Sequence, residues 1–240
     1  MSDKTAAKNH KANIRAIGRR LEASPEPLQI DLKTTALLVI DMQNAFVKRD
    51  GMFDLLGLDI KKARKIINPI KKLVEGSRKK EIKIIYIAHR YSEDLRESGG
   101  PSSGRWYKND MPKIYRDHPD WREKLIIRGT WGSDIIDELK PQQTDIVVEK
   151  STFSAFFCTN LDIILKTSGI KYLICVGTAT NICVEATIRD AFYLGYFPIL
   201  VADASANEGP IITQKATILN IMYVYGWVTY SENIMDLIKI

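Results

Sequence analysis

One segment of the chain carries a residue that could act as a nucleophile. Residues 174–186 read Ile-Cys-Val-Gly-Thr-Ala-Thr-Asn-Ile-Cys-Val-Glu-Ala, an apolar run followed by small residues and then a helical pattern. Thr180 or Asn181 could cap that helix, which would place Cys183 in its first turn. Free backbone N–H groups and the helix dipole there would lower the pKa of the thiol and could stabilise an oxyanion. A cysteine in apolar surroundings is otherwise a small core residue, so this segment alone leaves both interpretations open.

A carboxylate and an ammonium group stand near the ends of two other apolar runs. Asp41 directly follows residues 37–40, and Lys150 closely follows Val147-Val148. Taken singly, Asp41 could equally cap a helix, and a lysine after a strand is usually solvated. Together with Cys183 they would supply a nucleophile, a cation that stabilises a thiolate, and a group that moves protons.

These residues need a scaffold that brings the ends of separate strands together. Runs rich in Ile and Val without polar alternation, typical of strands covered on both faces, occupy residues 36–40, 82–88, 145–148, 172–176, 198–202 and 227–230. Helical patterns lie at about residues 60–80, 181–194, 211–223 and 232–240. This alternation predicts an α/β fold whose mostly parallel sheet lies between two helical layers. Such sheets bind ligands beyond their strand ends.

Two stretches of the chain do not follow this alternation of strands and helices. Residues 1–27 are predicted to form a basic tail, and residues 28–240 a single folded domain. Residues from about 91 to 128 are polar, include Gly99-Gly100-Pro101 and are long for a connector. We expect this stretch to be a lid-like insertion that covers the substrate.

Composition restricts the partners and the location of the protein. The formal net charge is +6, and the first twenty residues hold six basic residues against Asp3 alone. A solvated terminus is favoured over nucleic-acid or lipid binding, although a transit peptide stays open. No run approaches the roughly 18 apolar residues of a membrane span. The three cysteines indicate a reducing, cytoplasmic setting, and the histidines at positions 10, 89 and 118 are too scattered for a metal site, so no cofactor is expected.

Three segments, in this order, resemble the signature segments of isochorismatase-like cysteine hydrolases. They are residues 39–44 (Val-Ile-Asp-Met-Gln-Asn), Lys150 with residues 154–156 (Ser-Ala-Phe), and residues 177–184 (Gly-Thr-Ala-Thr-Asn-Ile-Cys-Val). The resemblance implies a Rossmann-like, three-layer α/β/α fold around a six-stranded parallel sheet of order 3-2-1-4-5-6. It also implies assembly into a homodimer or homotetramer.

The same resemblance implies a role for each reactive residue. Asp41 would be the general base and acid, Lys150 the cation and Cys183 the nucleophile. A cis peptide bond between Thr178 and Ala179 would accompany an oxyanion hole formed by the N–H groups of Ala179 and Cys183. The implied enzyme is a metal-independent amidohydrolase that cleaves a carbon–nitrogen bond of a small amide or ureido compound through a thioester.

Within the superfamily the chain is most similar to the ureidoacrylate amidohydrolases of bacterial pyrimidine breakdown, over about residues 28–238. The candidate substrate-binding residues are Gln43, His89, Tyr91, Glu97 and Phe153. His89, Tyr91 and Phe153 replace the Asn, Trp and Tyr expected in that group, which leaves the exact substrate open.

Several other functions compete with this interpretation. A biuret- or N-carbamoylsarcosine-type amidohydrolase would use the same chemistry. A nicotinamidase would need a histidine-rich metal cluster, and a true isochorismatase would lack Cys183. A non-catalytic binding protein would be marked by the loss of a triad member, and all three are present. No Gly-x-Ser-x-Gly elbow supports a serine hydrolase.

Overall fold

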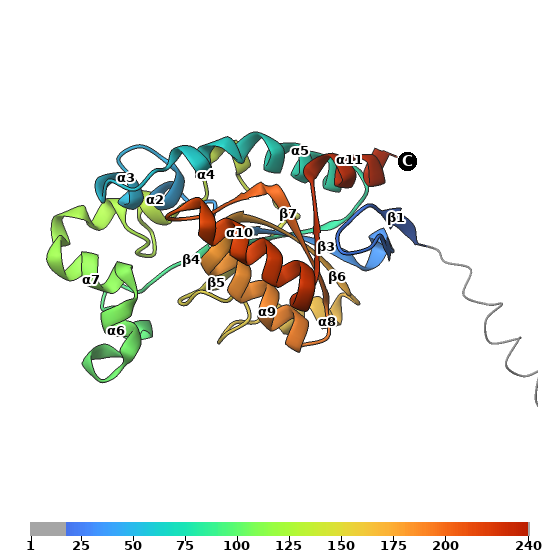
Figure 1. The fold of residues 1–240 in the computed structure, drawn as a ribbon. Coiled ribbons are helices and arrows are strands. Elements are labelled where there is room, and N and C mark those ends of the chain that lie inside the picture. Colours follow the sequence, from blue (N-terminus) through green and yellow to red (C-terminus); the bar gives the residue numbers. More distant parts are fainter. Residues whose placement is uncertain (1–17, 240) are drawn as a thin grey trace, which may run out of the picture.

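A six-stranded parallel sheet forms the centre of the molecule. In the computed structural model, which describes residues 18–239, its strands are β3 (Thr35–Ile40), β4 (Lys83–His89), β5 (Ile146–Lys150), β6 (Tyr172–Thr178), β7 (Phe197–Ala206) and β8 (Trp227–Thr229). Their order is β5-β4-β3-β6-β7-β8, and every neighbouring pair is parallel (Figure 1). This confirms the predicted order 3-2-1-4-5-6 and the α/β fold class.

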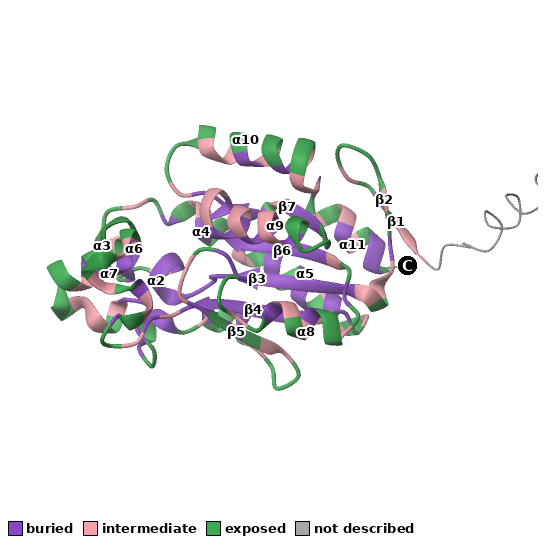
Figure 2. Cartoon of the chain, turned by 90° about the horizontal axis from the view of Figure 1, so that it is seen from below, coloured by how far each residue is buried: buried purple, intermediate pink, exposed green. Residues whose placement is uncertain are grey.

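The central strands are apolar because both of their faces are covered. All six residues of β3 are buried, and alternate side chains point into two separate cores. Leu37 and Val39 belong to one core, whereas Leu38 and Ile40 belong to the other. Figure 2 shows the sheet as a buried layer with exposed residues on the outer sides of the surrounding helices.

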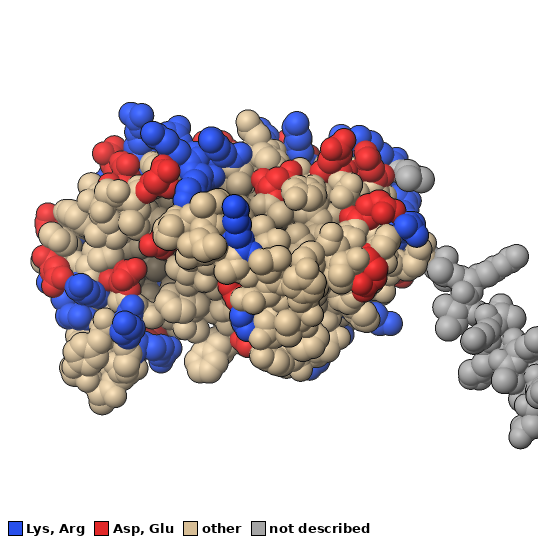
Figure 3. Space-filling model, viewed as in Figure 1, with Lys and Arg blue, Asp and Glu red and all other residues tan. Residues whose placement is uncertain are grey.

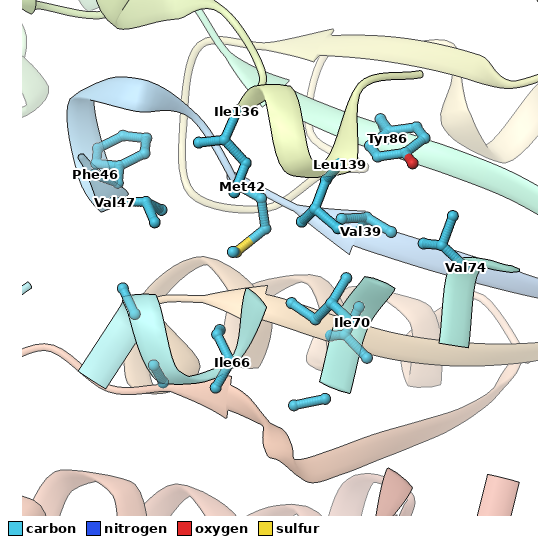
Figure 4. Packing of buried hydrophobic residues seen from close by; sticks show 14 of the residues in the cluster. Val39, Met42, Phe46, Val47, Ile66, Ile70, Val74, Tyr86, Ile136 and Leu139 are labelled. Atoms are coloured by element: carbon cyan, nitrogen blue, oxygen red, sulfur yellow. The ribbon is translucent and has the colours of Figure 1, made fainter. Parts of the chain in front are cut away.

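Helices cover the sheet on both sides. The first core packs against α4 (Lys61–Lys65), α5 (Ile67–Lys79) and α11 (Ser231–Lys239). Figure 4 shows Ile70 and Val74 of α5 facing Val39 of β3. The second core packs against α8 (Leu161–Thr167), α9 (Glu185–Tyr193), α10 (Ile211–Asn220) and η8 (Ile221–Tyr225).

The helix predicted over residues 60–80 is divided into α4 and α5 at Ile66. Pro69 explains the break, because proline has no N–H to donate to the carbonyl four residues earlier and is tolerated only in a first turn. None of the helices in the described part of the chain is long and apolar enough to cross a membrane.

The insertion at residues 91–128 contains more regular structure than an irregular loop. It folds into η2 (Arg96–Ser98), η3 (Gly100–Ser102), α6 (Gly104–Lys108), α7 (Asp110–Asp117) and η4 (Pro119–Lys124). In Figure 1 it lies beyond the carboxyl ends of the strands, beside α2 (Asn44–Val47) and α3 (Met52–Leu55). A covering role for this insertion remains a proposal.

The predicted boundary of the basic tail is too far along the chain. The sequence predicts that residues 18–27 belong to the tail, but β1 (Arg19–Leu21) pairs antiparallel with β2 (Leu28–Ile30). Leu21 is fully buried, and Ser24 exchanges two backbone hydrogen bonds with Val228 at 2.8 and 2.9 Å. This segment is therefore part of the fold, because it buries an apolar side chain and its backbone pairs with neighbouring strands. Its proline-rich sequence gives no sign of this pairing. The remainder of the predicted tail, residues 1–17, lies outside the described residues.

Candidate active site

The three predicted catalytic residues converge at the edge of the sheet where its parallel strands have their carboxyl ends. Asp41 directly follows β3, Lys150 ends β5, and Cys183 lies in η7 (Thr180–Val184), a wide helical turn after β6. The Lys150 ammonium nitrogen lies 2.8 Å from Asp41 Oδ2 and 3.4 Å from Cys183 Sγ. Lys150 also donates to the Thr152 carbonyl at 3.0 Å. One buried cation thus contacts both the carboxylate and the thiol.

The backbone at Asp41 leaves the strand in a conformation that few residues adopt. Its φ is +52°, in the left-handed region that aspartate tolerates better than most side chains. The Asp41 N–H still donates to the Ile87 carbonyl at 2.9 Å, while its own carbonyl accepts from Gln43 N–H at 2.8 Å. The turn therefore stays attached to β4 while it holds the carboxylate beside Lys150.

Cys183 lies in a turn of unusual width. The Ala179 carbonyl accepts the N–H groups of Ile182 at 3.0 Å and Val184 at 3.2 Å, on either side of Cys183. The peptide bond between Thr178 and Ala179 is cis, and both Ala179 and Cys183 line the same cavity. The N–H groups of Ala179 and Cys183, which are predicted to form an oxyanion hole, thus belong to residues that line one cavity.

Burial sets the electrostatics of the site. Desolvation raises the pKa of the Cys183 thiol and of the Asp41 carboxyl, and the Lys150 charge only partly opposes both shifts. Burial acts to lower the pKa of Lys150, but Asp41 and Cys183 outweigh it and the net shift is upward. The expectation that the helix terminus would lower the pKa of the thiol is therefore wrong for this site. A raised pKa disfavours the thiolate, so attack by Cys183 requires a base that accepts its proton.

His89 brings a neutral ring to the same cavity. Burial, followed by the nearby Lys150 charge, holds the pKa of His89 well below its usual range. The ring lies 5.3 Å from that of Tyr91, and its Nε2 atom is buried with no hydrogen-bond partner among residues 18–239. Such an atom is available to a ligand, because an unpaired buried polar group is costly to leave unsatisfied.

One set of side chains could in principle hold a metal ion. Ligand atoms of Asp41, His89 and Cys183 all lie within 4.8 Å of one another. The Lys150 ammonium, however, already contacts both Asp41 and Cys183, so a second cation there would meet direct charge repulsion. The donor set therefore fits a proton-transfer site better than a metal site.

The predicted substrate-binding residues separate into two groups. His89, Tyr91 and Phe153 line the cavity, and Phe153 is partly exposed at 39%. Gln43 is fully buried, donates to the carbonyls of His89 at 2.9 Å and Ser133 at 2.8 Å, and accepts the His89 N–H at 2.7 Å. It therefore fixes the end of β4 and is not among the cavity residues.

Glu97 is likewise absent from the cavity wall. Its carboxylate accepts the N–H and hydroxyl of Ser92 at 3.0 and 2.6 Å and pairs with Arg128 at 2.7 Å. Although burial opposes it, hydrogen bonding to Ser92 and Arg128 lowers the pKa of Glu97 to about 2. Glu97 thus joins the two ends of the insertion, and its contact with the substrate stays a prediction.

The sequence analysis missed much of the cavity wall. The further lining residues come from the segment after β3, from the insertion, from η7 and from the loop after β7: Phe46, Met52, Phe53, Asn109, Asp110, Met111, Ile126, Ile182 and Glu208. Asn109 donates to the Tyr91 hydroxyl at 2.9 Å and so holds the insertion against the strand end. No local pattern marks these residues, because docking of the loops decides which side chains face the cavity.

The segments that carry this geometry match a known family. The Isochorismatase domain family matches residues 35–233, which include all three converging side chains. The chain belongs to this family. Within it the chain is an amidohydrolase, a hydrolase of carbon–nitrogen bonds, in agreement with its relatives.

Two relatives illustrate the similarity. The ureidoacrylate amidohydrolase RutB of Caulobacter segnis is 44% identical over 209 residues, which cover 87% of this chain and 87% of the relative. The RutB protein of Rhizobium rhizogenes is 41% identical over 228 residues, covering 95% and 93%.

Solved structures agree with the observed fold. A cysteine hydrolase from Pseudomonas syringae has a TM-score of 0.72 and 28% identity, over 88% of this chain and 94% of that one. An N-carbamoylsarcosine amidase from Thermoplasma acidophilum has a TM-score of 0.60 and 29% identity, over 83% and 97%. A nicotinamidase from Bacillus subtilis, at 22% identity and a TM-score of 0.62 over 82% and 99%, shares the fold.

Proposed function

We propose that the protein hydrolyses a small amide or ureido compound through a thioester on Cys183. The observation that carries this proposal is the position of the Lys150 ammonium, 2.8 Å from Asp41 and 3.4 Å from Cys183. A buried thiol of raised pKa becomes a nucleophile only when a base takes its proton and a cation stabilises the charge. Asp41 and Lys150 supply these two functions.

The reaction begins when Asp41 takes the proton of Cys183. The thiolate attacks the carbonyl carbon, and the N–H groups of Ala179 and Cys183 stabilise the oxyanion. Asp41 then protonates the departing nitrogen, because an amine leaves poorly without an acid. Water activated by the same carboxylate cleaves the thioester and restores the thiol. The raised pKa of Asp41 suits a group that must both accept and return a proton.

The names of the relatives supply the first candidate substrate, ureidoacrylate. N-carbamoylsarcosine is a second candidate, since an amidase of that compound shares the fold at 29% identity. Biuret and nicotinamide complete a panel in which every compound carries a carbonyl carbon bonded to nitrogen.

The three cysteines, each unpaired, support a cytoplasmic location.

Ammonia release from this panel tests the proposal. We expect turnover of at least one compound by the wild type, resistance to a chelator, and a loss of about three orders of magnitude or more in Cys183→Ala. Cys158→Ala is the matched control, because that cysteine is exposed and outside the cavity. Activity that persists in Cys183→Ala would show that the nucleophile is assigned incorrectly.

A second copy of this chain is the proposed partner. Large apolar side chains are exposed along α9, α10 and η8: Phe192, Tyr193, Leu194, Ile211, Ile212, Leu219, Tyr223 and Val224. Figure 3 shows a surface over α9 and α10 that carries few charged residues. Contiguous apolar surface of this kind is typical of an interface. We expect Tyr223→Lys to reduce the mass measured by light scattering to that of the monomer, whereas a monomeric wild type would refute the proposal.

A further inference from the structure

The charges of the cavity are distributed unevenly about the reactive residues. In the sheet, β4 lies on one side of β3 and β6, whose ends carry two of the three reactive residues, and β7 lies on the other side. Glu208 follows β7, and the charge of Asp110 acts on it, so these two wall carboxylates gather on the β7 side. His89 and Tyr91, at the end of β4, are uncharged wall residues. An anionic group in the cavity would therefore meet less repulsion at the end of β4.

The Tyr91 hydroxyl offers a hydrogen-bond donor on the β4 side. It is buried and accepts a hydrogen bond from Asn109 Nδ2 at 2.9 Å, and its own proton has no acceptor among residues 18–239. Burial, which outweighs that hydrogen bond and the nearby positive charges, raises the pKa of Tyr91. The hydroxyl therefore stays protonated at neutral pH, and a carboxylate oxygen is a suitable acceptor for it.

Arg105 brings a cation to the same side of the cavity. It belongs to α6 of the insertion, is partly buried, and its charge acts on Tyr91. Its backbone is tied to the cavity wall, because its carbonyl accepts the N–H of Asn109 at 3.0 Å. Its guanidinium forms no ion pair in the described part of the chain. The planar fork of guanidinium N–H donors matches the two oxygens of a carboxylate.

The other charged groups that act on Tyr91 already have partners. Glu97 is paired with Arg128 at 2.7 Å, and Lys150 is held by the carboxylate of the reactive site at 2.8 Å. Among the charges that act on Tyr91, that of Arg105 is thus the one not matched by a protein carboxylate. An anionic ligand beside Tyr91 would supply the missing partner.

We infer that the Tyr91 hydroxyl and the Arg105 guanidinium together receive the distal carboxylate of an anionic substrate. The inference rests on the proposed function and extends it to how the substrate lies in the cavity. The scissile carbonyl is beside Cys183, and the anionic end is beneath the insertion at the end of β4. In ureidoacrylate this end is the acrylate carboxylate. Arg105 is then a specificity residue, because the group that it binds takes no part in bond breaking.

A matched substrate pair tests this orientation. Ureidoacrylate and its neutral amide differ only in the distal group. We expect Arg105→Met to lower kcat/KM for ureidoacrylate by at least about tenfold, mainly through KM, and to change kcat/KM for the amide by less than about twofold. Arg105→Lys keeps the charge but loses the fork, and should recover part of the loss. Lys108→Met removes an equal charge from an exposed position of the same helix and should affect neither substrate.

Binding measured without turnover separates this inference from the proposed function. The Cys183→Ala protein lacks the nucleophile, so calorimetry gives the Kd of ureidoacrylate and of its amide directly. In this background we expect Arg105→Met to raise the Kd of ureidoacrylate at least about tenfold and to leave that of the amide unchanged. Tyr91→Phe removes one hydrogen bond and no charge, and should raise the Kd of ureidoacrylate by a smaller factor.

The two proposals can fail separately. Equal losses for acid and amide in Arg105→Met, or no loss for either, would overturn the inference and leave the hydrolase intact. A Cys183→Ala protein that does not bind ureidoacrylate would overturn the inference as well. Absence of turnover across the panel, together with Arg105-dependent binding of the acid, would count against the proposed function alone.

Discussion

At the scale of single residues, the site depends on one enclosed ion pair. The side chains of Lys150 and Asp41 are 0% and 2% exposed, and no water-facing alternative is open to either charge. Such a pair adds little net stability, because each ion loses its hydration on burial. Its members nevertheless depend on each other, since removal of one leaves the other charge buried and unpaired.

A double-mutant cycle tests this dependence. We expect Lys150→Met to lower the free energy of unfolding by about 3 kcal/mol or more, and Asp41→Asn with Lys150→Met to lower it by less. Urea unfolding measures both changes. The partly exposed pair Lys48–Glu138 is the control, and Lys48→Met should cost no more than about 1 kcal/mol. If the effects of Lys150→Met and Asp41→Asn on the free energy of unfolding are additive, the two buried charges do not depend on each other.

The neutral state of His89 predicts how stability depends on pH. The unfolded chain binds a proton at this residue below its ordinary pKa of 6.5, but the folded protein resists doing so because burial depresses that pKa. The stability linked to His89 is therefore complete above pH 6.5 and decreases as the pH falls below it, by at most about 1.4 kcal/mol for each pH unit.

We expect His89→Asn to remove this loss between pH 6.5 and pH 5, as measured by urea unfolding. His118→Asn changes the other histidine of the described chain, which is exposed, and should retain the wild-type slope. An unchanged slope in His89→Asn would mean that the ring is not held neutral by the fold.

At the scale of elements, β3 and β6 carry the site because their backbones approach closely at their ends. Gly177 pairs with Ile40 and has a φ of +121°. A Cβ atom at that position would collide with the Ile40 carbonyl oxygen. Only glycine satisfies both the conformation and the close approach, which brings Asp41 and the turn of Cys183 together.

Substitution of this glycine should therefore affect both stability and activity. We expect Gly177→Ala to cost about 3 kcal/mol or more in unfolding free energy and to reduce kcat strongly. Gly195→Ala is the matched control, because Gly195 also has a positive φ, of 85°, but no atom within 4 Å of an added Cβ. If both variants lose similar amounts of unfolding free energy, the positive φ alone explains the effect. The close approach of the β3 and β6 backbones would then have no role.

The sequence predicted these elements well where burial alone determines the pattern. The runs at residues 36–40 and 172–176 are central strands covered on both faces, so continuous apolar residues identify them. The insertion was predicted less well, because α6 and α7 are short and their buried residues, such as Met111, belong to a core that also contains Phe46 from a separate segment. The break at Ile66 depended on the local effect of a proline within an otherwise regular helical pattern.

At the scale of the whole molecule, the segment before the sheet belongs to the domain. Arg19 donates to the Leu237 carbonyl at 2.7 Å, so β1 contacts α11, and Ser24, in the segment after β1, pairs with Val228 of β8 (Figure 1). We expect deletion of residues 1–27 to lower the thermal midpoint well below that of a chain lacking residues 1–17. Equal midpoints in a thermal melt would show that β1 contributes no stability.

The way the whole chain folds explains which site residues could be predicted from the sequence. Asp41, Lys150 and Cys183 follow strands, and parallel strand ends meet at one edge, so their convergence was predictable. Asp110 and Glu208 face the cavity only because separate loops fold over that edge. Gln43 lies two residues from Asp41 yet is not among the residues that line the cavity, and its amide is hydrogen-bonded to His89 and Ser133.

The insertion leaves and rejoins the sheet at nearly the same place. Tyr91 accepts the N–H of Arg128 at 2.9 Å and donates its own N–H to the Ile126 carbonyl at 2.9 Å, so the two ends of the segment are clasped together. The three reactive groups lie outside this closed loop, whereas Asn109, Asp110 and Met111 lie within it. We therefore expect replacement of this loop to change which substrates the enzyme accepts more than it changes how Asp41, Lys150 and Cys183 react. Relatives with new preferences could thus arise, or be engineered, by grafting one contiguous stretch of chain.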